Sequence, residues 1–374
     1  IASLGLSRST VSLLYTIGTL VGSFSLPFVG RFIDVRGPRV AVIIISALFA
    51  AACIWMGFVS GVVTLLIGFV MIRALGQGAL SLVSLHQINI WFVRKRGLAI
   101  GLNGMGIAAA TAFSPLLIQY LLDSFGWRVA YPVLGVLVAV VMLPIGATFY
   151  RSQPELYGLH PDGRPRKGDP EPEVLTERNM TATQARSTVT FWLFVAGDFM
   201  VNALGTGLIF HHYSIMATGG IDRLSASTFF IPLGLLSAAA VLFTGFLLDR
   251  VPPRFLLSGS QLLLVAALLL AGNASSPPLV LVYGGVLGLA QGSRSAIGGS
   301  VYAYYFGRRY VGAIKGLATT VGVAGTALGP LVYAYGFEWM GTYGPALLAT
   351  ALLPLALAVA APLLRPFRAD GSVR

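Results

Sequence analysis

The chain has 374 residues, of which 56% are hydrophobic and only 10% are charged, whereas about 25% of residues are charged in a typical soluble domain. This composition excludes an ordinary soluble enzyme or binding module built from globular domains. The net charge of +12 at pH 7 raises nucleic-acid binding as an alternative. The basic residues, however, lie in short loops between apolar segments, a pattern that favours a membrane protein and excludes a nucleic-acid partner.

Apolar segments of about 20 residues, each long enough to cross a bilayer as a helix, recur along the chain. We predict eleven spanning helices, at approximately 11–29, 40–58, 62–90, 98–122, 129–149, 190–213, 228–248, 255–272, 278–305, 312–335 and 344–364. Glycine and proline are frequent within them, which is typical of helices that pack closely in lipid. The predicted fold class is therefore all-α, in a multi-pass protein of the lipid bilayer.

One long polar segment, residues 150–188, interrupts this pattern. It carries several prolines and charged residues and too few apolar residues to fold alone, so we predict a flexible linker. The linker divides the chain into an N-terminal helical bundle, residues 1–149, and a C-terminal helical bundle, residues 189–374.

The distribution of Lys and Arg predicts the orientation in the membrane. Twenty of the 25 basic residues fall in loops on one side, in the linker or in the C-terminal tail. Because basic loops are retained in the cytoplasm, we expect the linker and the C-terminus to be cytoplasmic. A prokaryotic inner membrane is the simplest localisation for so compact a chain.

A charged ten-residue stretch, here called the signature turn, occurs twice. Residues 30–39 read Gly-Arg-Phe-Ile-Asp-Val-Arg-Gly-Pro-Arg, and residues 245–254 read Gly-Phe-Leu-Leu-Asp-Arg-Val-Pro-Pro-Arg, 215 positions later. A second motif, Leu-Gly-Gln-Gly-Ala at 75–79, is matched by Leu-Ala-Gln-Gly-Ser at 289–293, with an offset of 214. These matches predict a duplicated bundle.

The offset also bears on where the chain begins. Residue 1 aligns with about residue 216, which lies just after the predicted helix 190–213. The second half therefore has six predicted helices and the first half five. We expect a twelfth helix, the first of the natural protein, to precede Ile1; the alternative is a protein of eleven helices.

Two six-helix halves, a polar linker and the pattern Gly-x-x-x-Asp-x-x-Gly-x-Arg resemble the major facilitator superfamily of secondary transporters. Three local motifs resemble its monocarboxylate-porter and oxalate/formate-antiporter branch: Pro38 before Arg39, the sequence Pro-Glu-Leu-Tyr-Gly-Leu at 154–159, and Gly-Ser-Arg at 292–294. The resemblance implies two pseudo-symmetric bundles and alternating access to a central site. It also implies a small-molecule substrate, with a small organic anion as the first choice, and protons as a possible coupling ion.

In that family the signature turn is thought to hold the cytoplasmic ends of helices together in one state of the cycle. A carboxylate gains charge-assisted hydrogen bonds at a helix N-terminus, which gives this role a physical basis. The alternative is that the arginines of the turn only enforce orientation. The candidate residues are Gly30, Asp34, Gly37 and Arg39 in the first copy and Gly245, Asp249, Arg250 and Arg254 in the second.

Three charged residues, Arg73, Asp198 and Arg294, are predicted to lie within the hydrocarbon. A charge there is costly and marks a substrate pathway or a charged partner. Arg294 has two hypotheses of equal weight: its planar guanidinium binds a substrate carboxylate, or it forms a structural ion pair with Asp198.

The sequence around Asp198 and the position of Arg73 suggest further roles. Asn202 follows Asp198 by four positions and so shares its helix face, forming a polar stripe that could hold substrate or a coupling proton. Arg73 resembles an arginine of the family's fourth helix that is linked in some members to proton coupling, and packing against backbone carbonyls is the alternative.

Three function classes follow. Secondary transport of a small organic anion is the leading prediction, with drug or multidrug efflux as the second choice within it. A sensor with the same fold that has lost transport is the second class. An enzyme is the third, and it is not expected, because the sequence has no nucleophile elbow, metal-ligand cluster or phosphate-binding loop. No cofactor or metal is predicted.

Overall fold

The computed structural model describes residues 6, 8–163 and 179–363, and within these ranges every regular element is helical. The charged centre of the predicted linker and the basic C-terminal tail lie outside the described residues. The described chain forms two compact units.

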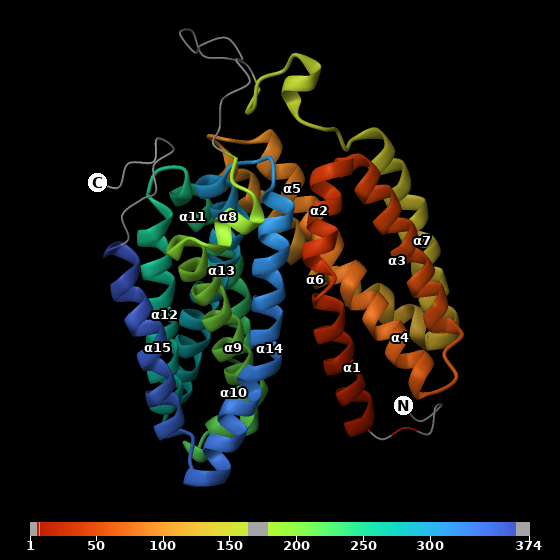
Figure 1. Cartoon of the computed structure of the whole chain (residues 1–374). Coiled ribbons are helices and arrows are strands. Elements are labelled where there is room, and N and C mark those ends of the chain that lie inside the picture. The colour runs from red at the N-terminus through yellow and green to blue at the C-terminus, as the bar shows by residue number, and fades with distance from the viewer. Residues whose placement is uncertain (1–5, 7, 164–178, 364–374) are drawn as a thin grey trace. The chain divides into compact units, whose positions relative to one another are not determined.

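Unit 1 consists of Ile1–Val93, Ile107–Ala182 and Phe306–Thr320. Its helices are, in chain order, α1 (Arg8–Ser23), α2 (Leu26–Arg36), α3 (Pro38–Gly57), α4 (Val62–Ile72), the π-helix η2 (Arg73–Leu80), α5 (Ser81–Trp91), the later part of α6 (Arg96–Phe125), α7 (Trp127–Thr148), the 3-10 helix η3 (Pro154–Tyr157) and the start of α14 (Val311–Met340). Helix α3 lies along α7 (Figure 1), where Gly57 and Gly135 meet the facing helix at distances that leave no room for a Cβ atom.

Unit 2 consists of Arg94–Gly106, Thr183–Tyr305 and Val321–Arg374. Its helices are the start of α6, α8 (Ala182–Arg186), α9 (Val189–Thr218), α10 (Arg223–Ser227), α11 (Phe230–Leu248), α12 (Pro253–Gly272), α13 (Pro277–Phe306), the later part of α14 and α15 (Gly344–Leu363). Helices α12 and α15 pack along each other (Figure 1). Its core is a large apolar cluster that includes the fully buried side chains of Leu208, Phe229, Leu264, Tyr283 and Leu287.

The helix boundaries repeat as the sequence duplication predicts. Pro253, the first residue of α12, lies 215 positions after Pro38, the first residue of α3. Val311, the first residue of α14, lies 215 positions after Arg96, the first residue of α6, and both helices have 30 residues. The pairing of α3 with α7 in unit 1 is matched by the pairing of α12 with α15 in unit 2.

The predicted count of eleven spanning helices is not confirmed. In the described part of the chain, nine helical spans are long and apolar enough to cross a membrane. The predicted segments 98–122 and 278–305 also form helices, α6 and α13, but neither is among the nine. Helix α13 is rich in glycine and small polar residues, which lowers its mean hydropathy.

The signature turn differs from the ten-residue loop that the sequence suggests. Helix α2 continues through Arg36, so Asp34 is part of a helix and the turn itself is confined to Gly37. Gly37 has a φ of 80°, in the left-handed region that favours glycine. In the second copy α11 ends at Leu248, and Asp249 is its C-cap.

Candidate functional site

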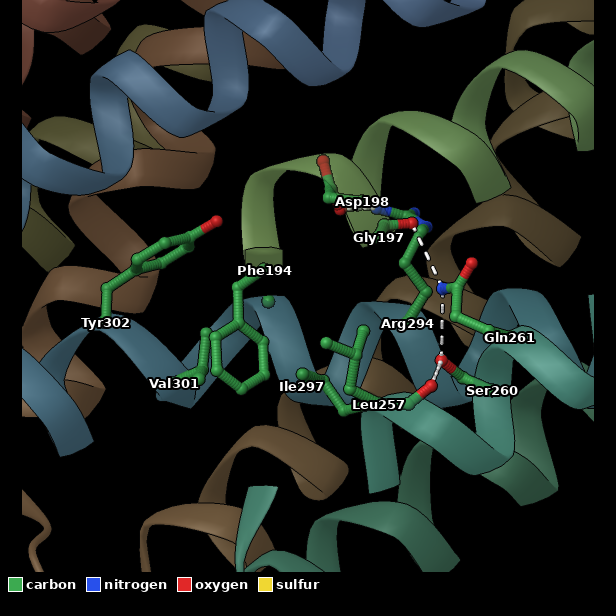
Figure 2. Close-up of a pocket in the computed structure, with 11 residues that line it drawn as sticks. Phe194, Gly197, Asp198, Leu257, Ser260, Gln261, Arg294, Ile297, Val301 and Tyr302 are labelled. Atoms are coloured by element: carbon green, nitrogen blue, oxygen red, sulfur yellow. Dashed lines mark hydrogen bonds and ion pairs between the residues drawn. The ribbon is translucent and has the colours of Figure 1, made fainter. Parts of the chain in front are cut away.

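A buried ion pair in unit 2 joins two of the three charged residues predicted in the hydrocarbon. Nη1 of Arg294, on α13, lies 2.7 Å from Oδ1 of Asp198, on α9 (Figure 2). The side chains of Arg294 and Asp198 are only 29% and 17% exposed. The sequence left open whether these two residues pair, and in the structure they do.

The second carboxylate oxygen of Asp198 is also occupied. Asn202, one helical turn further along α9, donates from Nδ2 to Oδ2 of Asp198 over 3.0 Å, so the predicted polar stripe exists. Gly322 of α14 lies directly against this carboxylate, and a Cβ atom there would clash with it. The site therefore depends on a glycine that the sequence analysis did not single out.

A pocket opens beside the ion pair, with an empty volume of about 250 Å³ that includes space open to solvent. Asp198 and Arg294 line it together with two polar residues of α12, Ser260 and Gln261 (Figure 2). The rest of the lining is mostly apolar or aromatic: Phe194, Leu257, Ile297, Val301 and Tyr302, with glycines 197 and 298. A charged pair in a largely apolar pocket can orient a small polar ligand, because electrostatic interactions are stronger where water is excluded.

Ser260 and Gln261 are site residues that sequence reasoning missed. Both are buried, with exposed fractions of 2% and 0%. They are neutral residues within the apolar segment 255–272, so no charge or motif marked them. A signal was nevertheless present, since a glutamine inside a predicted membrane helix needs partners for a polar amide.

Arg73, in unit 1, has different surroundings. Its Nε donates to Oγ1 of Thr19 over 2.9 Å, and its guanidinium carbon lies 4.8 Å from the centre of the Tyr15 ring. Among the described residues no carboxylate forms an ion pair with it. Arg73 is also the first residue of the π-helix η2, an irregularity that occurs frequently at functional sites.

In unit 1 the signature turn binds the start of a helix. The carboxylate of Asp34 accepts hydrogen bonds from the amides of Gly312 (2.9 Å) and Ala313 (2.8 Å), in the first turn of α14. Gly30 lies against Gly312 so closely that neither position has room for a Cβ atom. The carboxylate thus meets free amides and the positive end of the helix dipole.

The second copy repeats this contact within unit 2. Asp249 accepts hydrogen bonds from the amides of Gly97 (2.8 Å) and Leu98 (3.2 Å), in the first turn of α6. Gly245 lies against Gly97, again with no room for a Cβ atom.

The arginines of the two turns are exposed or lie over aromatic rings. Arg39 is exposed at the start of α3. Arg250 lies over the ring of Phe246, 3.5 Å from its centre, and Arg254 lies over its neighbour Phe255 at 4.8 Å. Within the described ranges no three His, Cys, Asp or Glu residues are grouped as metal ligands would be.

This geometry defines a class of protein. It is a multi-pass helical membrane protein with a charged pair in a pocket of one bundle. The family model described as Major Facilitator Superfamily matches residues 1–258. The chain belongs to this family.

Curated relatives agree with the branch that the sequence motifs indicated. The oxalate:formate antiporter of Oxalobacter formigenes is 26% identical over 208 residues, which cover 55% of this chain and 46% of the antiporter. Monocarboxylate transporter 14 of Mus musculus is 31% identical over 135 residues, which cover 36% of this chain and 26% of that protein. The matched part of the chain thus spans less than half the length of either relative.

Among solved structures, the human organic anion transporter MFSD10 (TETRAN) has a TM-score of 0.68 and 17% sequence identity to this chain. The similarity covers 93% of this chain and 83% of that one. At this identity the likeness concerns the fold, which is the all-helical fold of the superfamily.

Proposed function

We propose that the protein is a secondary active transporter that moves a small, monocarboxylate-like organic anion across a membrane by alternating access. The observation that carries this proposal is the Asp198–Arg294 pair, because a charged pair buried in the membrane lines a pocket there. The names of two relatives, an oxalate:formate antiporter and a monocarboxylate transporter, support an anionic substrate.

Arg294 is the proposed anchor for the carboxylate of the substrate. One guanidinium nitrogen, Nη1, is bound to Asp198, and the remaining donors of Arg294 have no partner among the described residues. A planar guanidinium can bind two carboxylates through different edges. An incoming anion can therefore contact Arg294 without first breaking the existing ion pair.

Charge balance supports protons as the coupling ion. The Asp198–Arg294 pair is neutral, so a bound anion gives the pocket a net negative charge in a medium of low dielectric, which is unfavourable. A proton on Asp198 would restore neutrality and strengthen the hold of Arg294 on the substrate. Anion and proton would then travel together.

The membrane arrangement forms part of the same proposal. We place α6 and α13 in the membrane with the nine apolar spans, giving the eleven crossings that the sequence predicts. The linker and the C-terminus lie on the cytoplasmic side, as the distribution of basic residues favours. The proposed location is a prokaryotic inner membrane.

Uptake into proteoliposomes tests the proposed site. The protein should accumulate labelled monocarboxylates when the outside is made acidic. Replacement Arg294→Gln should reduce uptake by about tenfold to a hundredfold, the equivalent of one lost charge-assisted hydrogen bond.

The variant Asp198→Asn tests proton coupling. Its side chain cannot take up a proton, so the variant should lose pH-driven accumulation and keep anion exchange.

Ser258→Ala is the matched control. Ser258 lies on α12, outside the pocket lining, and donates to the Ala358 carbonyl over 2.7 Å. Uptake unchanged by Arg294→Gln would exclude Arg294 as the anchor. A sensor would bind carboxylates without accumulating them, and a drug-efflux protein would ignore them.

A further inference from the structure

Gln261 has an amide oxygen without a hydrogen-bond partner inside the proposed pocket. The residue is 0% exposed and lines the pocket together with Asp198 and Arg294. Its Nε2 donates to the Gly197 carbonyl over 3.3 Å and lies 3.5 Å from Oγ of Ser260. Its Oε1 is buried, and no group of the described residues donates to it. A buried acceptor that stays unpaired is unfavourable, because it has lost its hydrogen bonds to water.

The orientation of this amide is determined by its neighbour. The Gly197 carbonyl can only accept a hydrogen bond, so the NH₂ group of Gln261 must face it. Turning the amide over would place two acceptors together. In Figure 2, Nε2 of Gln261 faces the Gly197 carbonyl and Oε1 lies on the other branch of the amide.

Several nearby donors have other partners, and none of the remaining ones donates to Oε1. The hydroxyl of Ser260 donates to the Leu257 carbonyl over 2.8 Å. Nδ2 of Asn202 donates to Asp198, and so does Nη1 of Arg294. Tyr302 and the other N–H groups of Arg294 also line the pocket, and none of them donates to Oε1 in the described structure. Oε1 is therefore available to a donor that enters with the occupant of the pocket.

We propose that Gln261 makes the pocket selective for an organic anion that carries a hydroxyl group beside its carboxylate. The carboxylate contacts Arg294, and the hydroxyl donates to Oε1 of Gln261. This inference rests on the proposed function and narrows its substrate class. Oε1 is covered in the conformation described, so the hydroxyl reaches it when the pocket side chains move apart.

The charge of the pocket favours a hydroxyl over an ammonium group as this donor. Asp198 is the one carboxylate among the pocket-lining residues described, and Arg294 already neutralises it. A second cation would be placed beside a guanidinium with no further negative charge to balance it. A neutral hydroxyl meets no such repulsion.

Glycolate and propionate are the matched pair of substrates for a test. They have equal charge and an equal number of heavy atoms, and differ by a hydroxyl in place of a methyl group. In proteoliposomes the protein should take up glycolate about tenfold or more faster than propionate at equal concentration, because a site built to bind a hydroxyl rejects the analogue that lacks it. Gln261→Met, which keeps the length but removes the acceptor, should abolish this preference.

Two controls accompany this test. Propionate uptake by Gln261→Met shows that the variant is folded. Ser258→Ala, a substitution on the same helix outside the pocket, should keep the preference for glycolate. Equal uptake of both acids by the unmodified protein would overturn the inference and leave the proposed function standing. An equal fall in uptake of both acids in Gln261→Met would also overturn it, since a water molecule or packing would then account for Oε1. Failure to take up either acid, or any other monocarboxylate, would overturn both proposals.

Discussion

Asp34 in unit 1 and Asp249 in unit 2 make the same kind of contact, whereas Arg73 and Arg294 do not. Each carboxylate accepts two amide hydrogen bonds in the first turn of a 30-residue helix. Arg294 has a carboxylate partner at 2.7 Å, but Arg73 has a hydroxyl and an aromatic ring. The duplication thus repeats the helix-end contacts without repeating the arrangement of charge in the membrane.

The arginines also occupy different positions in the repeat. With the offset of 214 that relates the second sequence motif, Arg73 aligns with Leu287, and Arg294 aligns with Leu80. The two copies of the signature turn are 215 residues apart, whereas the two copies of the motif at 75–79 are 214 residues apart. The π-helix η2 begins at Arg73, between the first signature turn and the first copy of this motif. A π-turn contains one residue more per hydrogen-bonded ring than an α-turn, so a single extra residue in unit 1 explains the change of offset.

Among the tests that compare unit 1 with unit 2, removing the charge of Arg73 should change carboxylate uptake the most. If Arg73 is a second contact for the anion, Arg73→Gln should lower carboxylate uptake by about tenfold to a hundredfold, as expected for a lost charge-assisted hydrogen bond. Arg73→Lys keeps the charge and should retain part of the activity. Initial uptake rates in proteoliposomes measure both effects.

Thr19→Val separates charge from packing at this position. It removes the hydroxyl that accepts from Arg73 and leaves the guanidinium in place. We expect a smaller fall in uptake than for Arg73→Gln, because the guanidinium and its charge remain in place. If Thr19→Val and Arg73→Gln are equally impaired, Arg73 acts through packing and not through its charge.

Much of the framework could be predicted from the sequence, because hydropathy and a fixed offset are properties of whole segments. The two turns and the superfamily follow from such patterns, and so does the choice of Asp198 and Arg294 as candidates, which form an ion pair in the structure. The end of α2 at Arg36 could not be predicted in the same way. Asp34 and its neighbours form a charged stretch, and such a stretch is equally typical of a loop. Gln261 was missed because one neutral amide in an apolar helix has no pattern, and its role depends on which carbonyl faces it.

The two signature turns should differ in their contribution to stability. The side chain of Asp34 is 3% exposed, with Nδ1 of His86 at 3.6 Å from Oδ1, whereas Asp249 is exposed. Asp34→Asn places an NH₂ group opposite a buried amide and should cost about 1.5–3 kcal/mol. Asp249→Asn should cost about 0.3–1 kcal/mol, the range for an exposed charge at a helix N-terminus.

Thermal unfolding of the purified variants in detergent measures this difference. Glu338→Gln is a suitable control, because Glu338 is an exposed acidic residue near the end of α14 and its neutralisation should change the melting temperature little. Equal shifts for Asp34→Asn and Asp249→Asn would show that the two turns are equivalent despite their different burial.

A further test concerns a contact in unit 1 between the linker segment and the loop before α14. Nη2 of Arg308 donates to Oε1 of Glu155 over 2.8 Å, and Nη1 donates to the Ile90 carbonyl over 2.9 Å. Both side chains are less than a fifth exposed. Glu155→Gln keeps an acceptor and removes only the charge, so it should cost about 1 kcal/mol.

A double-mutant cycle tests whether this contact fastens the linker. Glu155→Gln, Arg308→Gln and the double variant should give a coupling energy of about 0.5–1 kcal/mol in thermal unfolding, as expected for two residues in direct contact. Arg308→Gln alone should cost more than Glu155→Gln, because it also removes the donor to Ile90. A coupling energy of zero would mean that the linker segment is not held by this pair. In that case unit 1 would depend on Asp34 as the stronger tie to the segment that begins α14.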